Sequence, residues 1–170
     1  MAPSLQSGLR LRPQSSGDRP FLLRLFGQSR RAEFAALGWS KDQLDSFLYA
    51  QFKAQSLAYA QRFPGARFDI VELDALPVGR FYVAKHAAAY VIIDVTIDPA
   101  WRGRGIATRL ISDLQREAGG EGGSISLQVH TGSAARRLYA RLGFTTVVEH
   151  GPDAQMRWPA DCDGTLPGKS

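Results

Sequence analysis

The stretch IIDVTIDPAWRGRGIATRLISDL, residues 92–114, decides the fold. It opens with a β-branched run that ends at Pro99, which predicts a strand followed by a turn. It closes with apolar residues at the spacing of a helix face: Ile106, Leu110, Ile111 and Leu114. Between strand and helix, residues 102–105 alternate arginine with glycine, so the connecting turn is bare and positively charged.

The composition of this turn suits an anion. Gly103 and Gly105 would let an anion approach the main chain, and the free amides at a helix start point toward it. A pyrophosphate is the natural guest, and Arg102 and Arg104 add charge. From spacing alone, a tight turn with solvated arginines remains an equal alternative.

Two common phosphate loops do not match. A P-loop needs a Gly-Lys-Ser/Thr ending, which the sequence lacks. A dinucleotide fingerprint needs a third glycine where Thr108 stands. It also needs an acidic residue at the end of the next strand, and SISLQVHTG, residues 124–132, offers none.

Length and composition indicate one globular domain. The chain has 170 residues, 44% hydrophobic and 22% charged. No apolar run reaches the length of a membrane span, and residues 1–18 lack the apolar core of a signal peptide, so we expect a cytoplasmic protein without a membrane partner. Cys162 has neither a disulfide partner nor a metal-ligand pattern around it, so no metal is expected.

The charge is basic, with a net value of +5 and a pI near 9.7. Seventeen of the 21 basic residues are arginine, a balance that suits a polyanionic partner. The arginines are scattered along the chain and no aromatic-rich binding strand accompanies them. Nucleic-acid binding is therefore not expected.

The remaining pattern predicts an α/β (α+β) fold with a mixed sheet. Helices are expected at residues 21–31, at 41–62 after an N-cap at Ser40, and at 133–142. Strands are expected at residues 67–74, 77–85, 90–97, 124–129, 144–150 and 155–158, with a possible first strand at 8–14. The expected organisation is a flexible N-terminus at 1–18, a folded domain at 19–158 and a disordered tail at 159–170.

Two motifs together resemble one family. Residues 102–107 follow the pattern Arg-x-x-Gly-x-Gly/Ala after Asp98-Pro99, which resembles the coenzyme A loop of the GNAT superfamily of N-acyltransferases. Residues 133–144, SAARRLYARLGF, resemble the family's Asn-x-Ala-x-x-Leu-Tyr-x-x-x-Gly-Phe helix. The resemblance spans residues 68–158. It implies a single-domain GNAT-like fold, with a mixed, mostly antiparallel central sheet, helices on both faces, and an acceptor-binding region in the two N-terminal helices.

The resemblance implies acetyl-CoA as co-substrate. Main-chain groups of residues 95–97 would pair with its pantetheine arm, and the amides of residues 103–108 would hold its pyrophosphate. One strand amide would polarise the thioester carbonyl. Ser133 replaces the family's asparagine, yet it can cap its helix and donate to the coenzyme. The implied cofactor-binding residues are Val95, Thr96, Ile97, Arg102, Gly103, Arg104, Gly105, Ile106, Ala107, Thr108, Ser133 and Arg136.

The resemblance also implies the proton transfers. Family members place a general acid at the position of Tyr139, beside the coenzyme sulfur, although a tyrosine here could also simply pack in the core. Some relatives carry a glutamate base at the position of Gln128, and glutamine cannot act as a base. Asp94 is the first candidate in its place, with an arginine partner as its alternative role. Glu72 and His130 are the other candidates.

The acceptor is expected to be a primary amine, on a small molecule, a protein N-terminus or a lysine. Polar groups that could line its site, or simply face solvent, are Gln51, Lys53, Gln55, Tyr59 and Arg80. The alternative is a catalytically idle acyl-CoA-binding sensor or scaffold. Tyr139 argues against that alternative, and Gln128 argues mildly for it. The resemblance further makes a homodimer plausible.

Overall fold

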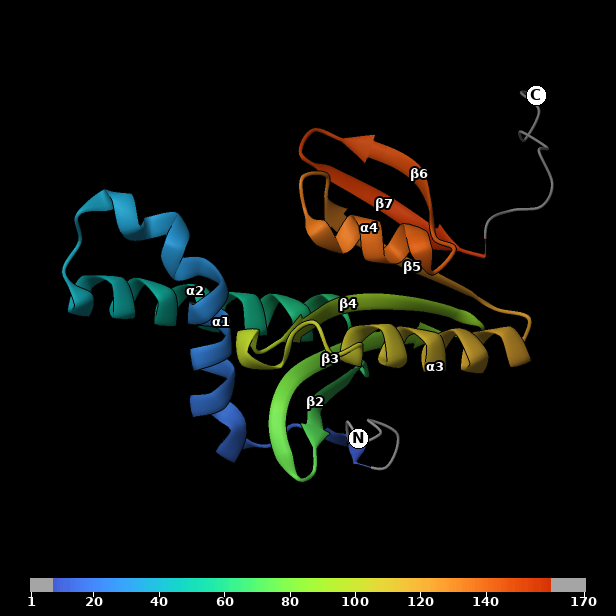
Figure 1. Ribbon diagram of the computed structural model, residues 1–170, viewed down its shortest axis with the longest axis horizontal. Coiled ribbons are helices and arrows are strands. Elements are labelled where there is room, and N and C mark those ends of the chain that lie inside the picture. Colours follow the sequence, from blue (N-terminus) through green and yellow to red (C-terminus); the bar gives the residue numbers. More distant parts are fainter. Residues whose placement is uncertain (1–7, 160–170) are drawn as a thin grey trace. The chain divides into compact units, whose positions relative to one another are not determined.

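The computed structural model describes residues 8–159 and contains a seven-stranded mixed sheet in the order β1-β2-β3-β4-β5-β7-β6 (Figure 1). The strands are β1 (Leu9–Pro13), β2 (Arg67–Leu73), β3 (Leu76–His86), β4 (Ala89–Ile97), β5 (Ser124–His130), β6 (Thr145–His150) and β7 (Asp153–Trp158). The helices are α1 (Arg19–Phe34), α2 (Lys41–Arg62), α3 (Ile106–Gly120) and α4 (Ala134–Arg141). The mixed α/β fold predicted from the sequence is confirmed. The expected disordered tail and Cys162 lie outside the described residues, apart from Pro159.

The chain forms two compact units. The first unit contains residues 8–84 and 93–110 of the described chain, and the second contains residues 85–92 and 111–159. None of the described helices is both long and apolar enough to cross a membrane.

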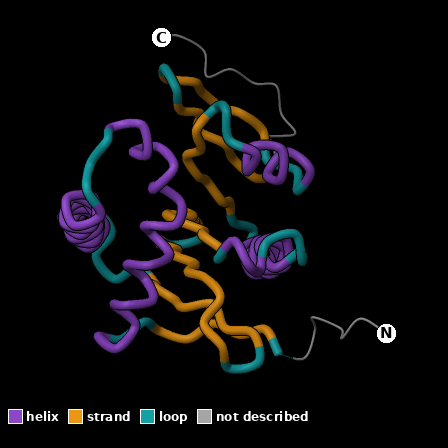
Figure 2. The backbone as a smooth tube through the Cα atoms, turned by 60° about the vertical axis from the view of Figure 1, so that its left-hand side comes forward, coloured by secondary structure: helices purple, strands orange, loops and turns teal. Residues whose placement is uncertain are grey.

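Helices α1 and α2 build the core of the first unit. Figures 1 and 2 show α1 lying across α2. Phe26 and Phe52 meet edge to face, with ring centroids 5.8 Å apart. The buried cluster they belong to comprises Phe21, Leu22, Leu25, Phe26, Leu48, Phe52 and Ile70. Because Ile70 lies on β2, both helices pack against the same side of the sheet in this unit.

Helix α2 begins and ends where local signals predict. The Gln43 amide donates to the Ser40 hydroxyl at 3.2 Å, and the Gln43 side chain accepts from the Ser40 amide at 2.9 Å. This reciprocal pair satisfies two donors that a helix start leaves without partners. After Arg62 the chain turns at Gly65, which has a φ of 77°. By contrast, α1 extends to Phe34, three residues beyond its predicted end.

Strands β1, β2 and β3 form an antiparallel meander in the first unit. Asp74 and Ala75 form the β2–β3 turn, with φ values of 51° and 65°. Two residues with positive φ match the twist of a hairpin, and β3 begins at Leu76, one residue before the strand predicted at 77–85. Residues 78–83 of β3 are all buried, so both faces of this strand are covered.

The second unit is built around β5. The beginning of β4 pairs with β5 in parallel, from Ala89 opposite Ser124 to Ile92 opposite Leu127. A parallel pair needs a long crossover, which α3 supplies. On its other side β5 pairs antiparallel with β7, which pairs antiparallel with β6. Buried side chains in this unit include Ile111, Leu114, Ala118, Ile125, Leu127 and Met156.

Candidate active site

The turn after β4 is fixed by hydrogen bonds to its own neighbours. Asp98 is almost fully buried, and its carboxylate accepts from the Ala100 amide at 2.9 Å. Its own amide donates to the Val78 carbonyl at 2.8 Å. Arg102 Nε donates to the Ile97 carbonyl at 2.9 Å. The chain is therefore anchored on both sides of the 3₁₀ turn at Pro99–Trp101 before it enters the glycines.

The two glycines of the turn adopt the left-handed conformation. Gly103 has a φ of 73° and Gly105 a φ of 76°, values that residues with a Cβ rarely adopt. A Cβ built on either glycine would meet no atom within 4 Å. Backbone conformation and open space, not crowding, therefore explain these glycines. Helix α3 begins directly after them at Ile106.

This arrangement fits a phosphate group. The first amides of a helix have no partner within the helix, and the helix dipole makes its N-terminus attractive to anions. Arg104 adds a guanidinium that stacks over the Trp101 ring, 4.7 Å from the ring centroid. Gly103, Arg104 and Gly105 are exposed, and the space where a Cβ of either glycine would stand is open.

Strand β4 carries the residues expected to contact a pantetheine arm. Val95 and Thr96 are half-buried and Ile97 is buried. Gly79 on β3 approaches them closely: a Cβ there would lie 2.5 Å from the Thr96 carbonyl oxygen and 2.8 Å from Ile97 Cδ1. Only glycine fits at position 79 without moving β4, a constraint that the sequence analysis missed although a glycine inside a strand signals close approach.

Asp94 lies at the centre of a polar cluster in the first unit. Its Oδ2 accepts from Arg80 Nη2 at 2.8 Å and from the Tyr59 hydroxyl at 3.2 Å. Its Oδ1 accepts from the Thr96 hydroxyl at 2.7 Å. Arg80 also donates to Gln55 at 3.0 Å. The cluster therefore joins α2, β3 and β4. Asp94 has the arginine partner that the sequence analysis gave as its alternative role.

The charges of this cluster are coupled. Arg80 is 4% exposed. Burial, the largest single influence, lowers its pKa, but the charge and hydrogen bond of Asp94 together with Tyr82 and Tyr59 outweigh burial, so the pKa of Arg80 is raised. Burial raises the pKa of Tyr59 to about 12, and the neighbouring Asp94 charge adds to that effect. Tyr59 is therefore a neutral hydrogen-bond donor to Asp94 at physiological pH.

Glu72, another candidate base, lies in a second ion cluster. It is 4% exposed and accepts from Arg10 at 2.7 Å and from Arg12 at 2.5 Å. The hydrogen bond from Arg12 lowers the pKa of Glu72, and that from Arg10 lowers it further. A carboxylate held ionised by two arginines is a poor proton acceptor, so the structure argues against Glu72 as the base.

The second motif forms α4 in the second unit. Ser133 is the N-cap, and its hydroxyl accepts from the Ala135 amide at 3.2 Å, which confirms the predicted capping role. Tyr139 is 6% exposed and its ring lies 5.8 Å from that of Phe144. Gly143, with a φ of 87°, ends the helix.

Two predicted site residues of the second unit have partners of their own. Arg136, expected to bind the cofactor, pairs with Glu149 and donates to the Thr146 hydroxyl at 3.3 Å. His130 is exposed, and its Nδ1 accepts from the Gly132 amide at 3.3 Å. Gln128 is exposed on β5. Within residues 8–159, no three acidic, histidine or cysteine side chains gather as a metal ion would require.

Known proteins of one family are similar to this chain in sequence pattern and in fold. A family model described as the acetyltransferase (GNAT) domain matches residues 37–158. Among solved structures, the PaiA N-acetyltransferase from Thermoplasma acidophilum, in complex with coenzyme A, is 18% identical with a TM-score of 0.66, over 88% of this chain and 97% of that chain. An acetyltransferase from Thermus thermophilus is 23% identical with a TM-score of 0.62, over 90% of this chain and 97% of that chain.

A GNAT family acetyltransferase from Elizabethkingia anophelis, with acetyl-CoA bound, is 14% identical with a TM-score of 0.54, over 89% of this chain and 98% of that chain. At these identities the likeness to solved structures concerns the fold. No curated protein sequence matches this chain.

Proposed function

The chain belongs to the GNAT family of acetyltransferases, and from this premise we propose that it transfers an acetyl group from acetyl-CoA to a primary amine. The observation that carries the proposal is the open turn before α3. Its two glycines hold a left-handed conformation with empty space above them, and α3 starts directly behind them. Two similar folds were crystallised with coenzyme A or acetyl-CoA, which supports the same co-substrate here.

In this proposal the chain binds acetyl-CoA with main-chain groups. The amides of residues 103–108 take the pyrophosphate, and Arg102 and Arg104 add positive charge. Main-chain groups of Val95, Thr96 and Ile97 pair with the pantetheine arm, and one strand amide polarises the thioester carbonyl.

The proposed reaction is a direct attack in a ternary complex. The neutral amine adds to the thioester carbonyl and forms a tetrahedral intermediate. When the C–S bond breaks, the sulfur leaves with the electron pair and takes a proton from the Tyr139 hydroxyl. The nitrogen gives its extra proton to the base as the amide forms, and the tyrosinate regains a proton from water. The family resemblance of residues 133–144 supports this role for Tyr139.

Asp94 is the proposed general base, and its surroundings set a limit on that role. Its carboxylate already accepts from Arg80, Tyr59 and Thr96, so a proton from the amine must compete with three donors for the carboxylate oxygens. If Asp94 removes the proton, kcat/KM plotted against pH reaches its plateau at a pH well below the pKa of the acceptor amine. If the amine must arrive already neutral, the plateau follows the amine's own pKa when acceptors of different basicity are compared.

Calorimetric titration tests the co-substrate site. We expect acetyl-CoA to bind the wild-type chain, and the double variant Gly103→Asp, Gly105→Asp to lose at least about 100-fold in affinity, since two carboxylates would face the pyrophosphate. The matched control is Gly38→Asp, Gly65→Asp. Both control glycines also have positive φ and no neighbour within 4 Å of a Cβ, so they carry the same backbone strain away from the turn. Equal affinity in the two double variants would sink the proposed site.

Thiol release with a panel of primary amines tests catalysis. We expect turnover by the wild-type chain, and a fall of about 100-fold in kcat for Tyr139→Phe with little change in acetyl-CoA affinity. Tight acetyl-CoA binding with no turnover on any amine would favour the idle sensor instead.

A further inference from the structure

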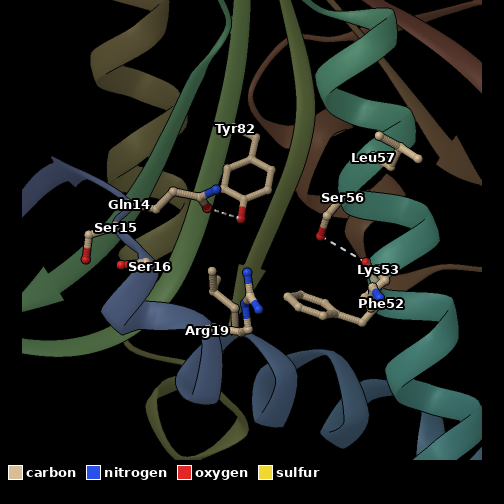
Figure 3. A pocket seen from close by; sticks show the side chains of 10 residues that line it. Gln14, Ser15, Ser16, Arg19, Phe52, Lys53, Ser56, Leu57 and Tyr82 are labelled. Carbon is tan, nitrogen blue, oxygen red and sulfur yellow. Dashed lines mark hydrogen bonds between the residues drawn. The ribbon is translucent and has the colours of Figure 1, made fainter.

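A pocket of about 530 Å³ opens in the first unit, between the entry to α1, the middle of α2 and strand β3 (Figure 3). Its volume is in the range of small-molecule sites. The turn before α3 and helix α4 contribute nothing to its lining, so the acetyl-CoA residues proposed above do not account for it.

The charged side chains in the lining are both cations. Arg19 comes from the start of α1 and Lys53 from α2, and no carboxylate lines the pocket. Within the described residues 8–159, neither Arg19 nor Lys53 forms an ion pair. The adjacent Asp18 is already paired with Arg12, at 2.7 Å. The pocket therefore carries uncompensated positive charge beside a concave surface, which favours an anion.

Beside these cations, the pocket has an apolar wall. Leu22 and Phe52 are buried beneath it, and Leu57 is 59% exposed at its edge. The Tyr82 hydroxyl donates to Gln14 Oε1 at 2.6 Å, which leaves the Gln14 amide nitrogen as a donor. Figure 3 shows this pair at one side of the pocket, with Phe52 and Lys53 at the other and Arg19 below.

We propose that this pocket binds a small organic anion with an apolar body, its oxyanion held by Arg19 and Lys53 and its body lying on Phe52, Leu57 and the Tyr82 ring. An inorganic anion would leave the apolar wall in contact with water, and an uncharged apolar molecule would leave both cations without an anionic partner. The Lys53 ammonium lies over the Tyr49 ring, 5.5 Å from the ring centroid, a contact that leaves it available to an anion. A carboxylate and a phosphate monoester share the oxyanion that the cations recognise. The inference does not depend on acetyl-CoA binding, because none of the residues proposed to hold acetyl-CoA lines this pocket; it shares only Lys53 with the residues expected near the acceptor.

Titration followed by NMR tests the site, with phenylacetate as the probe. We expect a dissociation constant on the order of 1 mM for a ligand of this size. Phenethylamine, which has the same ring but the opposite charge, is expected to bind at least about tenfold more weakly. Equal binding of the two probes, or no binding of either in the millimolar range, would overturn the proposal.

The double variant Arg19→Gln, Lys53→Gln locates the binding. Its control, Arg24→Gln, Arg62→Gln, removes the same charge from the same two helices at residues that do not line the pocket. We expect at least a tenfold loss of phenylacetate affinity in the first and none in the second. Equal losses would mean that net charge, not the pocket, attracts the probe. Thermal unfolding of both variants checks that each still folds.

Two further probes identify the ligand chemistry. Phenyl phosphate that binds more tightly than phenylacetate, with the same dependence on Arg19 and Lys53, supports the pocket and assigns it to a phosphate monoester. The reverse order supports the pocket and assigns it to a carboxylate. Inorganic phosphate that binds as tightly as phenyl phosphate contradicts the role of the apolar wall. The variant Leu57→Glu, which places a carboxylate at the pocket edge, is expected to weaken both aryl probes.

Discussion

Two clusters of the first unit pair an arginine with carboxylates, yet they differ in how many of the arginine's nitrogens have a partner. Arg12 donates from Nε to Glu72 and from both terminal nitrogens to Asp18, so its whole guanidinium fork is used. Arg80 donates from Nη2 to Asp94 and Gln55, while its buried Nε has no partner among the described residues.

This difference in hydrogen bonding distinguishes the Arg12 cluster, which stabilises the fold, from the Arg80 cluster, which also lies beside the proposed active site. Arg12 ties β1 to β2 and to the entry of α1, and each contact holds the fold together. The Asp94 cluster lies on β4, directly before the residues proposed to bind the pantetheine arm. Buried polar groups are normally satisfied, so an incompletely satisfied one near a proposed site suggests that function, not stability, keeps it.

Removal of one partner from the Asp94 cluster is expected to give the largest effect. Asp94→Leu leaves the buried Arg80 without its counter-charge, which costs about 3–5 kcal/mol in the free energy of unfolding. Urea denaturation measures this loss.

The control is the double variant Arg80→Met, Asp94→Leu, which removes both charges and should recover most of the lost stability. A double variant as unstable as Asp94→Leu alone would show that packing around Asp94, rather than an uncompensated charge, is responsible. Recovered stability with lost acetyl transfer would separate the functional role of the pair from its structural role.

Arg12→Gln is expected to have a smaller effect at pH 7, because Arg10 still pairs with Glu72 and the Ser15 amide still donates to Asp18. Its signature is the pH dependence. The hydrogen bond from Arg12 is the main cause of the lowered pKa of both Asp18 and Glu72. Groups with a lowered folded-state pKa stabilise the fold above their unfolded pKa, near 4, and lose that contribution as the pH falls.

The wild-type chain should therefore lose more stability between pH 7 and pH 3 than Arg12→Gln does. Denaturation curves at the two pH values measure the difference. Arg24→Gln, whose guanidinium lies over the Phe21 ring, is the control and should behave like the wild type. An identical pH dependence in Arg12→Gln would mean that other partners hold the two carboxylates ionised.

Local signals explain how much of the fold could be predicted. Helix α2 was predicted from Ser40 to Arg62 because a capping residue and a Pro-Gly stop mark its ends. No stop signal follows the apolar part of α1, so the sequence could not show that it runs to Phe34. The start of β3 was predicted one residue late, at Pro77, because Asp74 and Ala75 adopt positive φ without a glycine to mark the two-residue turn.

The site was predictable only where its residues are neighbours in sequence. The turn at 102–105 carries its own pattern, and the structure gives its glycines the left-handed conformation that such a turn needs. The Arg80–Asp94 pair and the pocket are assembled from distant segments. Their residues could be named from the sequence, as Arg80, Asp94 and Lys53 were, but their partners depend on how the helices pack on the sheet.

Tyr59→Phe is expected to change the Asp94 cluster least. It removes one of the hydrogen bonds to Asp94 and should cost about 0.5–1.5 kcal/mol at pH 7. The pKa of Tyr59, raised by burial and by Asp94 to about 12, keeps the hydroxyl protonated in the folded chain when an unfolded tyrosine already ionises near 10. Stability linked to Tyr59 is therefore present below pH 10 and lost as the pH rises toward 12.

Between pH 9 and pH 11 the wild type should lose more stability than Tyr59→Phe. The control Tyr49→Phe, a change at an exposed residue of the same helix, should match the wild type. Equal losses in Tyr59→Phe and the wild type would mean that the tyrosine donates too weakly to Asp94 to be counted in the cluster.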